Sequence, residues 1–487
     1  MTTRPIRLLR RGQTLRLDGV PPDRTLLDLL REDLHCKAVK EGCGEGDCGA
    51  CTVVLAQAEG GGLRYRAINS CIRLAHSVDG MALWTAEDIA SPDGQLHPAQ
   101  QALLDGHGSQ CGFCTPGFVM SLFGMYQNRV CRGEAVTRES AVADLSGNLC
   151  RCTGYRPIVD AAMQMAGLPP ARIDEPALLA RLQALSAEPG AEGEGYQALD
   201  TLDGLLAERA AHPDALVAAG CTDVGLWITK QHKRYARVLD VTRAAELRRI
   251  EQRPDGALAL GAAVTLEDAF SAIAGVRPAL RGFFQRFAGL PVRQSGTLGG
   301  NVANGSPIGD SMPVLMALGA RLVMASRARG ERALPVEEFY TGYRQNRLAA
   351  DELLVRIELP PPLPGEFVRA YKVSKRLEDD ISAVCLALRL RLESDARVAE
   401  IAIGAGGVAA TPMRARQTEQ ALTGRPWGLE SLRDAREALR GEFRPISDMR
   451  ASSGYRSQVL GNLLERFWHE QQGGTLVSLS DLTEAPR

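Results

Sequence analysis

The distribution of cysteine constrains this chain more than any other feature of its sequence. Of the twelve cysteines in 487 residues, ten lie before residue 153. In a chain of this size, such clustering favours metal or redox ligation over a disulfide framework. The 57 Lys and Arg residues balance 58 Asp and Glu residues, so nucleic acid and anionic lipid are poor partners. Only seven histidines are present, which disfavours a metal site built from several imidazoles.

The sequence also carries no sign of a membrane span or an export signal. No run of about 18 apolar residues occurs. The pair Arg10-Arg11 is followed by Gly12, Gln13 and Thr14, whereas an export signal requires an apolar stretch. We therefore expect this pair to lie on the surface of a hairpin, and the protein to be cytoplasmic.

Hydrophobic periodicity and proline positions predict a multidomain α+β protein. Alternation over 6–17 predicts a hairpin, and the leucines after Thr25 predict an amphipathic helix with Thr25 as its cap. Short strands are predicted over 52–55 and 63–67, which suggests a β-grasp unit. Helices are predicted over 98–104, 116–126, 139–145, 157–165 and 177–187, three of them with proline in the first turn. The predicted boundaries are 1–90 (β-grasp), 91–166 (helical), 167–195 (linker), 196–364 (mixed strands and helices) and 365–480 (C-terminal α+β).

The first set of cysteines has the spacing C-x4-C-x2-C-x19-C, which is the plant-type [2Fe–2S] arrangement. Glycines between these cysteines allow a tight loop that directs its N–H groups inward, toward an anionic cluster. A structural zinc site is the alternative, but zinc usually takes two separate C-x2–4-C pairs. The predicted ligands of this first cluster are Cys43, Cys48, Cys51 and Cys71.

A second set combines C-x2-C with C-x-C, a spacing that by itself does not distinguish zinc from iron. Helix starts predicted at Pro116 and Pro157 follow the two pairs, and helix N-termini stabilise anionic clusters. A second [2Fe–2S] cluster is favoured because a single cluster must pass its electron to another group. The predicted ligands of this second cluster are Cys111, Cys114, Cys150 and Cys152. The other cysteines are expected to be buried free thiols; these are Cys36, Cys131, Cys221 and Cys385.

Two glycine-rich loops lie within 196–364. The first, 217–225, predicts a strand, a tight turn and a helix. Such a turn offers N–H groups to a pyrophosphate, but the pattern taken alone favours a plain strand–helix turn. The second, 295–310, consists largely of small and hydroxylated residues, so we expect a ligand close to its backbone. A third segment, 401–409, approximates a dinucleotide-binding motif, but Glu419 follows it too closely for a Rossmann site. We expect this segment to be a strand that ends in a tight turn.

The strings EGCGEGDCGACTV, QCGFCTPG and GNLCRCTGYRPIV resemble the iron–sulfur portion of the xanthine dehydrogenase family of molybdenum hydroxylases. The resemblance covers residues 1–165 and includes all eight ligand positions. It implies two N-terminal domains, one β-grasp and one helical, each with a [2Fe–2S] cluster. Both glycine-rich loops resemble the flavin domain of the same family, which implies that 196–364 binds FAD non-covalently. The section 365–480 resembles the CO-dehydrogenase flavoprotein C-terminal domain.

The same resemblance implies which residues contact FAD. It places Phe287 and Leu354 against the flavin ring, and Thr297, Asp310 and Lys372 as further polar contacts. Without the resemblance, the residues themselves favour plain roles: core positions for the two apolar residues, and solvated surface for Asp310 and Lys372. The residues implied along the FAD phosphates are Val217, Ala218, Ala219, Gly220, Cys221, Thr222, Asp223 and Val224, with Cys221 standing where a small polar residue is expected.

These cofactors together imply an electron-transfer subunit. [2Fe–2S] clusters move single electrons, whereas FAD stores two and releases them as a hydride. The resemblance implies a route from a molybdenum cofactor to the second (helical-domain) cluster, then to the first (β-grasp) cluster, then to FAD and NAD⁺, in the oxidation of hypoxanthine and xanthine to urate. Because this chain ends at Arg487, we expect a separate large subunit that carries the molybdenum cofactor, in an (αβ)2 heterotetramer. No catalytic residue is then expected in this chain.

Two alternatives stay open at this point. The same electron chain could serve a hydroxylase of aldehydes, N-heterocycles or carbon monoxide. A zinc-bound interaction protein with a nucleotide-binding domain is a more remote alternative, and flavin absorption at about 450 nm would exclude it. The sequence determines neither the substrate nor whether NAD⁺ or O₂ accepts the electrons.

Overall fold

The computed structural model describes residues 4–187, 193–377 and 379–474. A part of the predicted linker and the last residues of the predicted C-terminal section therefore lie outside the described residues. The chain divides into two compact units. Unit 1 consists of Met1–Asp200, Asp214–Arg243 and Ala288–Gly296, and unit 2 of Thr201–Pro213, Ala244–Phe287 and Thr297–Arg487. None of the helices in the described ranges has the length and apolar character needed to cross a membrane.

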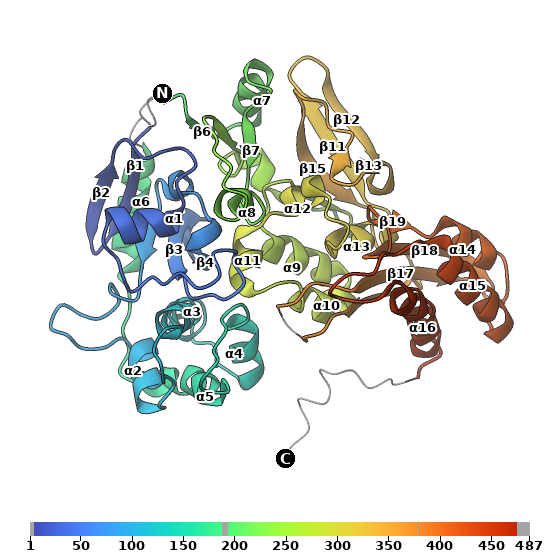
Figure 1. The fold of residues 1–487 in the computed structure, drawn as a ribbon, viewed down its shortest axis with the longest axis horizontal. Coiled ribbons are helices and arrows are strands. Elements are labelled where there is room, and N and C mark those ends of the chain that lie inside the picture. Colours follow the sequence, from blue (N-terminus) through green and yellow to red (C-terminus); the bar gives the residue numbers. More distant parts are fainter. Residues whose placement is uncertain (1–3, 188–192, 378, 475–487) are drawn as a thin grey trace. The chain divides into compact units, whose positions relative to one another are not determined.

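Unit 1 begins with a mixed five-stranded sheet (Figure 1). The predicted hairpin is confirmed, because the first two strands pair antiparallel from Ile6↔Leu17 to Arg10↔Gln13. Both later strands are also present, and both are longer than predicted. In the sheet order β2-β1-β5-β3-β4, the strands are β1 (Ile6–Arg10), β2 (Gln13–Leu17), β5 (Ala82–Trp84), β3 (Thr52–Glu59) and β4 (Gly62–Asn69).

The helix predicted after Thr25 is present, but it is short and changes its geometry. The Thr25 hydroxyl accepts the Asp28 N–H at 3.1 Å and so caps α1 (Leu26–Asp28). A π-helical turn, Leu29–Asp33, continues from it. Its leucines are buried in the core that lies against the sheet.

The expectation that Arg10 and Arg11 lie together on the hairpin surface is wrong for Arg10. Its Nε donates to the Asp88 carboxylate at 2.9 Å, and the residue is only 9% exposed. Arg11 occupies the turn with φ 49° and keeps an exposed side chain. A long-range ion pair therefore buries one member of this sequence pair.

A helical layer follows the sheet in unit 1. All four predicted helices of this section are confirmed, and α3 packs on the sheet where Gly124 lies against Val54 and Ala67. The helix predicted inside the linker packs on the same core through Leu182 and Leu185, so this part of the linker belongs to the compact unit. The helices are α2 (Pro98–Asp105), α3 (Thr115–Asn128), α4 (Arg138–Asp144), α5 (Arg156–Gln164) and α6 (Glu175–Ala187).

A small parallel sheet completes unit 1. Its strand order is β6-β8-β7, and the predicted strand, turn and helix of the first glycine-rich loop is confirmed as β7 followed by α8. A proline-started helix, α11, ends at the second glycine-rich loop. These elements are β6 (Tyr196–Ala198), β7 (Leu216–Ala218), α8 (Val224–Thr229), β8 (Val238–Asp240) and α11 (Leu290–Ser295).

Unit 2 contains an antiparallel sheet of order β12-β11-β15-β10-β9 and a short hairpin. Its strands are β9 (Ile250–Gln252), β10 (Leu258–Gly261), β11 (Arg321–Ser326), β12 (Gly330–Pro335) and β15 (Leu353–Leu359), and the hairpin consists of β13 (Tyr340–Gly342) and β14 (Gln345–Asn346). Its helices are α7 (Leu202–Ala211), α9 (Leu266–Val276), α10 (Arg281–Gln285), α12 (Leu298–Asn304) and α13 (Ser311–Ala317).

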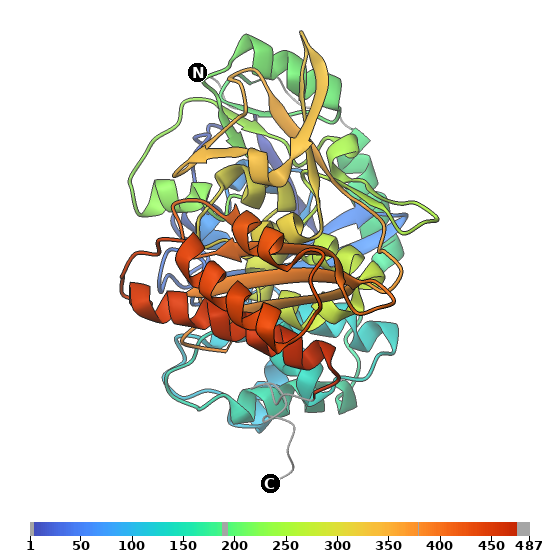
Figure 2. The ribbon, with the colours of Figure 1, turned by 90° about the vertical axis from the view of Figure 1, so that its right-hand side faces the viewer.

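The C-terminal part of unit 2 is a second antiparallel sheet, with three helices on one of its faces (Figure 2). The predicted strand over 401–409 is confirmed, and it ends in a turn at Gly407 with φ 78°. Its elements are β16 (Phe367–Val373), β17 (Val384–Leu392), β18 (Val398–Gly406), β19 (Met413–Arg414), α14 (Arg416–Leu422), α15 (Leu429–Glu442) and α16 (Ser453–Gln471).

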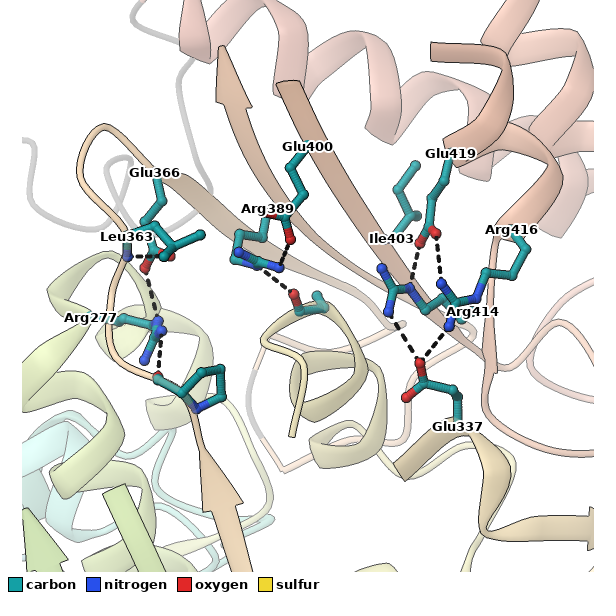
Figure 3. A network of polar contacts seen from close by, with 12 residues as sticks. Arg277, Glu337, Leu363, Glu366, Arg389, Glu400, Ile403, Arg414, Arg416 and Glu419 are labelled. Carbon is teal, nitrogen blue, oxygen red and sulfur yellow. Dashed lines mark hydrogen bonds and ion pairs between the residues drawn. The ribbon is translucent and has the colours of Figure 1, made fainter. Parts of the chain in front are cut away.

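Arginine-centred ion pairs hold the C-terminal part of unit 2 to the rest of that unit (Figure 3). Arg277, at the end of α9, pairs with Glu366 at 2.9 Å, and both side chains are buried. Arg414 pairs with Glu337 at 3.1 Å and with Glu419 at 2.7 Å. Removing one partner of a buried pair leaves an uncompensated charge, so these contacts favour a single arrangement of the sheet.

Candidate cluster and flavin sites

The first set of cysteines comes together at one end of the β-grasp sheet. The Cys43 sulfur accepts the Glu45 N–H at 3.4 Å and the Cys48 N–H at 3.3 Å. Hydrogen bonds from the thiols of Cys48 and Cys71 lower the pKa of Cys43. Cys51 lies within hydrogen-bond reach of Cys71. N–H groups directed at a sulfur are what an anionic cluster requires of its loop.

The glycines of this loop are needed for its shape. Gly44, Gly46 and Gly49 have φ values of 65°, 83° and 68°, which residues with a side chain rarely adopt. A Cβ on Gly46 would lie 2.5 Å from the Ile72 side chain, and one on Gly49 would lie 2.3 Å from the Gly147 carbonyl. The loop is thus a close backbone cradle, and it fits the predicted [2Fe–2S] cluster.

The second set of cysteines lies at the starts of α3 and α5, as predicted. Burial and a hydrogen bond to Cys150 raise the pKa of Cys114 to about 12. At Cys150, burial raises the pKa, but hydrogen bonds from Thr153 and Cys152 outweigh it and leave that pKa lowered. Cys111 and Cys152 are exposed and within hydrogen-bond reach of each other. The four thiols therefore form two adjacent pairs, a donor set that fits a second cluster.

The two cysteine sets are joined directly through the backbone. The Leu149 N–H, next to Cys150, donates to the carbonyl oxygen of Cys48 at 3.0 Å. Beside this bond, the buried Asn148 amide donates to the Gly49 carbonyl at 3.1 Å and accepts the Ser121 hydroxyl at 2.6 Å. A single backbone hydrogen bond therefore connects Cys48, a proposed ligand of the first cluster, to Leu149, the neighbour of Cys150, a proposed ligand of the second.

The four cysteines outside the two sets differ in burial. Cys36, Cys221 and Cys385 are buried, whereas Cys131 is only partly buried. Among the residues that the structure describes, no three or more His, Cys, Asp or Glu side chains are arranged to hold a single metal ion.

One group of predicted FAD contacts, 217–224, lies in unit 1. A Cβ on Gly220 would lie 1.8 Å from the Ser295 carbonyl oxygen, so the turn after β7 lies in backbone contact with the end of α11. The Ser295 hydroxyl and the Gln294 side-chain oxygen are buried, and neither has a hydrogen-bond partner in the described structure. Such orphaned groups fit a polar ligand. Sequence reasoning pointed to the loop that begins at Ser295 but named neither side chain.

Cys221 occupies the turn of this loop in an unusual way. Its φ is 61°, and its thiol is packed in an apolar cluster with Leu74, Tyr196 and Val224. Burial raises the pKa of this thiol to about 12. The Cys221 side chain is therefore part of the core, and only the backbone of this residue is available to a ligand.

The other predicted FAD contacts lie in unit 2. Asp310 and Lys372 are not solvated surface: they form a buried ion pair at 3.0 Å, and the Ser382 hydroxyl, which sequence reasoning missed, donates to Asp310 at 2.6 Å. Phe287 is 8% exposed, with its ring edge-on to Phe270.

Two further predicted contacts of unit 2 serve its local structure. The Thr297 hydroxyl caps α12 by accepting the Gly300 N–H at 3.0 Å. Leu354 is a buried residue of β15. Much of the second glycine-rich loop is thus the short helix α12, in which a Cβ on Gly299 would lie 2.5 Å from the Ala262 carbonyl. Close backbone packing within unit 2 accounts for small residues there.

Comparison with known protein families identifies each section of the chain. Two iron–sulfur matches cover its first part, and two flavoprotein matches cover the rest. The chain corresponds to the iron–sulfur and flavin part of the molybdenum hydroxylase family. The four-domain fold class, the two [2Fe–2S] domains and the FAD-binding domain are thereby confirmed. The matched descriptions are "2Fe-2S iron-sulfur cluster binding domain" (9–73), "[2Fe-2S] binding domain" (85–163), "FAD binding domain in molybdopterin dehydrogenase" (192–362) and "CO dehydrogenase flavoprotein C-terminal domain" (369–471).

Individual relatives agree with this family. Xanthine dehydrogenase of Drosophila subobscura is 34% identical over 484 aligned residues, which cover 87% of this chain and 36% of the relative. Xanthine dehydrogenase of Emericella nidulans is 31% identical, over 98% of this chain and 39% of the relative. The chain thus spans little more than a third of the length of these relatives.

Solved structures match a smaller part of the chain. A carbon monoxide dehydrogenase from Hydrogenophaga pseudoflava aligns with a TM-score of 0.53 and 25% identity, over 56% of this chain and 96% of the solved one. Quinoline 2-oxidoreductase from Pseudomonas putida 86 gives a TM-score of 0.52 and 25% identity, over 58% and 99%. Nearly the whole of each solved chain therefore corresponds to little more than half of this one.

Proposed function

We propose that this chain is the electron-transfer subunit of a xanthine dehydrogenase. It would receive electrons from a partner subunit with a molybdenum cofactor and deliver them to NAD⁺ as hypoxanthine and xanthine are oxidised to urate. The observation that carries this proposal is the order of the domains in one chain. Xanthine dehydrogenases align across the iron–sulfur and flavin parts together, whereas the matched chains of the carbon monoxide and quinoline enzymes cover little more than half of this chain.

Separate groups of residues in this chain would hold the two clusters and FAD. The clusters and FAD, when bound, supply one-electron and two-electron chemistry. The eight cysteines would hold the two clusters: Cys43, Cys48, Cys51 and Cys71 the first, and Cys111, Cys114, Cys150 and Cys152 the second. The hydrogen bond from Leu149 to Cys48 keeps the two cluster loops in contact. The backbone of 217–224 would bind the FAD phosphates, and Phe287, Thr297, Asp310, Leu354 and Lys372 would contact the rest of FAD.

Substrate oxidation by the assembled enzyme tests the proposal. The chain would be purified with its large subunit, and reduction of NAD⁺ would be followed with xanthine, an aldehyde, quinoline or carbon monoxide as the electron donor. We expect xanthine to give the highest kcat/KM, by at least about tenfold, since a site built for one polar substrate rejects analogues strongly. Preference for an aldehyde, quinoline or carbon monoxide would favour the related hydroxylases, and dependence on O₂ instead of NAD⁺ would correct the acceptor.

The partner subunit is expected to dock where the second cysteine set reaches the surface. Cys111 and Cys152 are exposed, and beside them Phe113 is 48% and Tyr155 40% exposed. Exposed aromatic side chains at a redox centre favour a protein interface over a free surface. Such an interface also shortens the path from the partner's cofactor to the second cluster. We propose an (αβ)2 assembly that uses this face.

Replacing Phe113 by glutamate is expected to weaken binding of the large subunit about tenfold or more, because a charge would replace an aromatic side chain that the proposed interface would bury. The Kd of the two purified subunits would be measured by a surface-binding assay. Leu429→Glu, at another highly exposed apolar residue in unit 2, serves as the matched control and should leave the Kd unchanged. Iron content would be checked in both variants, and an unchanged Kd in the Phe113 variant would contradict this docking face.

A further inference from the structure

The helix α8 lies directly against Ile72, the residue that follows the last proposed ligand of the first cluster. Gly225, in the first turn of α8, has no side chain, and a Cβ there would lie 2.5 Å from the Ile72 carbonyl and 2.6 Å from the Ile72 Cα. Ile72 follows Cys71 in the sequence. Leu226 packs on the core of the β-grasp sheet. Backbone contact thus fixes the position of α8 beside the first cysteine set, within unit 1.

The far end of α8 carries a lysine that reaches the loop of the first cluster. Lys230 follows the last residue of the helix, and its ammonium donates to the carbonyl oxygen of Cys43. Its Nζ lies 3.9 Å from the Glu45 carboxylate, and both side chains are about half exposed. Lys230 therefore contacts both ends of the segment from Cys43 to Glu45. Within this segment, the Glu45 N–H donates to the Cys43 sulfur.

The positive charge of Lys230 lies among several negatively charged groups. The loop carries Glu41, Glu45 and Asp47, and a [2Fe–2S] cluster with four thiolates is itself anionic and gains a further negative charge on reduction. A nearby cation stabilises the more negative of two states. Net charge and hydrogen bonds around the cluster are among the properties that set its reduction potential.

We propose that Lys230 is a positioning residue for the first cluster, which holds the segment from Cys43 to Glu45 and raises the reduction potential of that cluster. The second cluster lies outside this contact, so Lys230 would increase the driving force for an electron that passes from the second cluster to the first. The same short helix follows the turn proposed to bind the FAD phosphates, so Lys230 links the flavin-binding segment to the cluster that delivers electrons to it. This inference depends on the first cluster being present, but not on the substrate or the partner.

A redox titration followed by EPR tests the inference on the purified full chain, without substrate or partner. In Lys230→Gln, we expect the equilibrium constant for reduction of the first cluster to fall about three- to tenfold, where tenfold corresponds to 59 mV. The second cluster, measured in the same sample, should keep its potential. Lys233→Gln is the matched control, because it removes the same charge three residues later, where the Lys233 ammonium lies 5.6 Å from the Trp227 ring centre.

A further variant separates positioning from simple loss of folding. Lys230→Arg keeps the charge and the donor, so its first cluster should titrate close to that of the natural protein. Equal first-cluster potentials in Lys230→Gln and Lys233→Gln, with full iron content, would overturn the inference. If Lys230→Gln instead loses the first cluster alone, retention of that cluster in Lys230→Arg supports the inference, and its loss there overturns it.

Discussion

Replacing Gly220 by alanine is expected to weaken flavin binding about tenfold or more, while both iron–sulfur clusters remain. The new Cβ would lie 1.8 Å from the Ser295 carbonyl oxygen and 2.6 Å from the Gly296 Cα. Both are backbone atoms, which cannot rotate away, so the turn after β7 must move from the end of α11. Overpacking of this kind costs about 1–3 kcal/mol, and we expect the Kd for FAD to rise about tenfold or more.

The measurement is the FAD content of the purified chain, together with a titration of the flavin-free chain with FAD. Gly167→Ala is the matched control, because nothing lies within 4 Å of the position of its new Cβ. Iron content should be the same in both variants. Full flavin occupancy in Gly220→Ala, with an unchanged Kd, would show that the segment 217–224 does not hold the FAD phosphates.

Replacing Cys150 by serine is expected to remove the second cluster and about half of the iron, because each [2Fe–2S] cluster needs its four sulfur ligands. One of the two EPR signals of the reduced chain should disappear. The first cluster and FAD should remain, since the Leu149 N–H that donates to the Cys48 carbonyl is a backbone group and does not depend on the Cys150 sulfur.

Cys131→Ser provides the control for this experiment. Its thiol is partly buried and donates to Gln127 at 3.5 Å, and Cys131 is not among the predicted ligands. Both EPR signals should survive in this variant. Retention of both signals in Cys150→Ser would contradict the assignment of Cys150 as a ligand, and loss of both would show that the first cluster depends on the second.

Local features of the fold were predictable because their causes are local. Thr25 caps α1 by accepting the N–H of Asp28, only three residues later in the sequence. Prolines in the first turn mark the starts of α2, α3 and α5. Predictions about surface and linker positions were weaker. Arg10 is buried by Asp88, 78 residues away, and α6 joins a core that no local pattern describes.

The amino-acid sequence by itself determined the kind of chemistry, because cysteine spacing and glycine-rich turns are properties of short segments. Only the tertiary structure decided which segments meet. The bond from Lys230 to Cys43 joins residues 187 positions apart, and the buried pair of Lys372 with Asp310 spans 62. Such contacts arise from the packing of whole elements, for instance the approach of α8 to Ile72 that Gly225 allows. Packing depends on the shapes of both surfaces, so the spacing within one segment cannot reveal it.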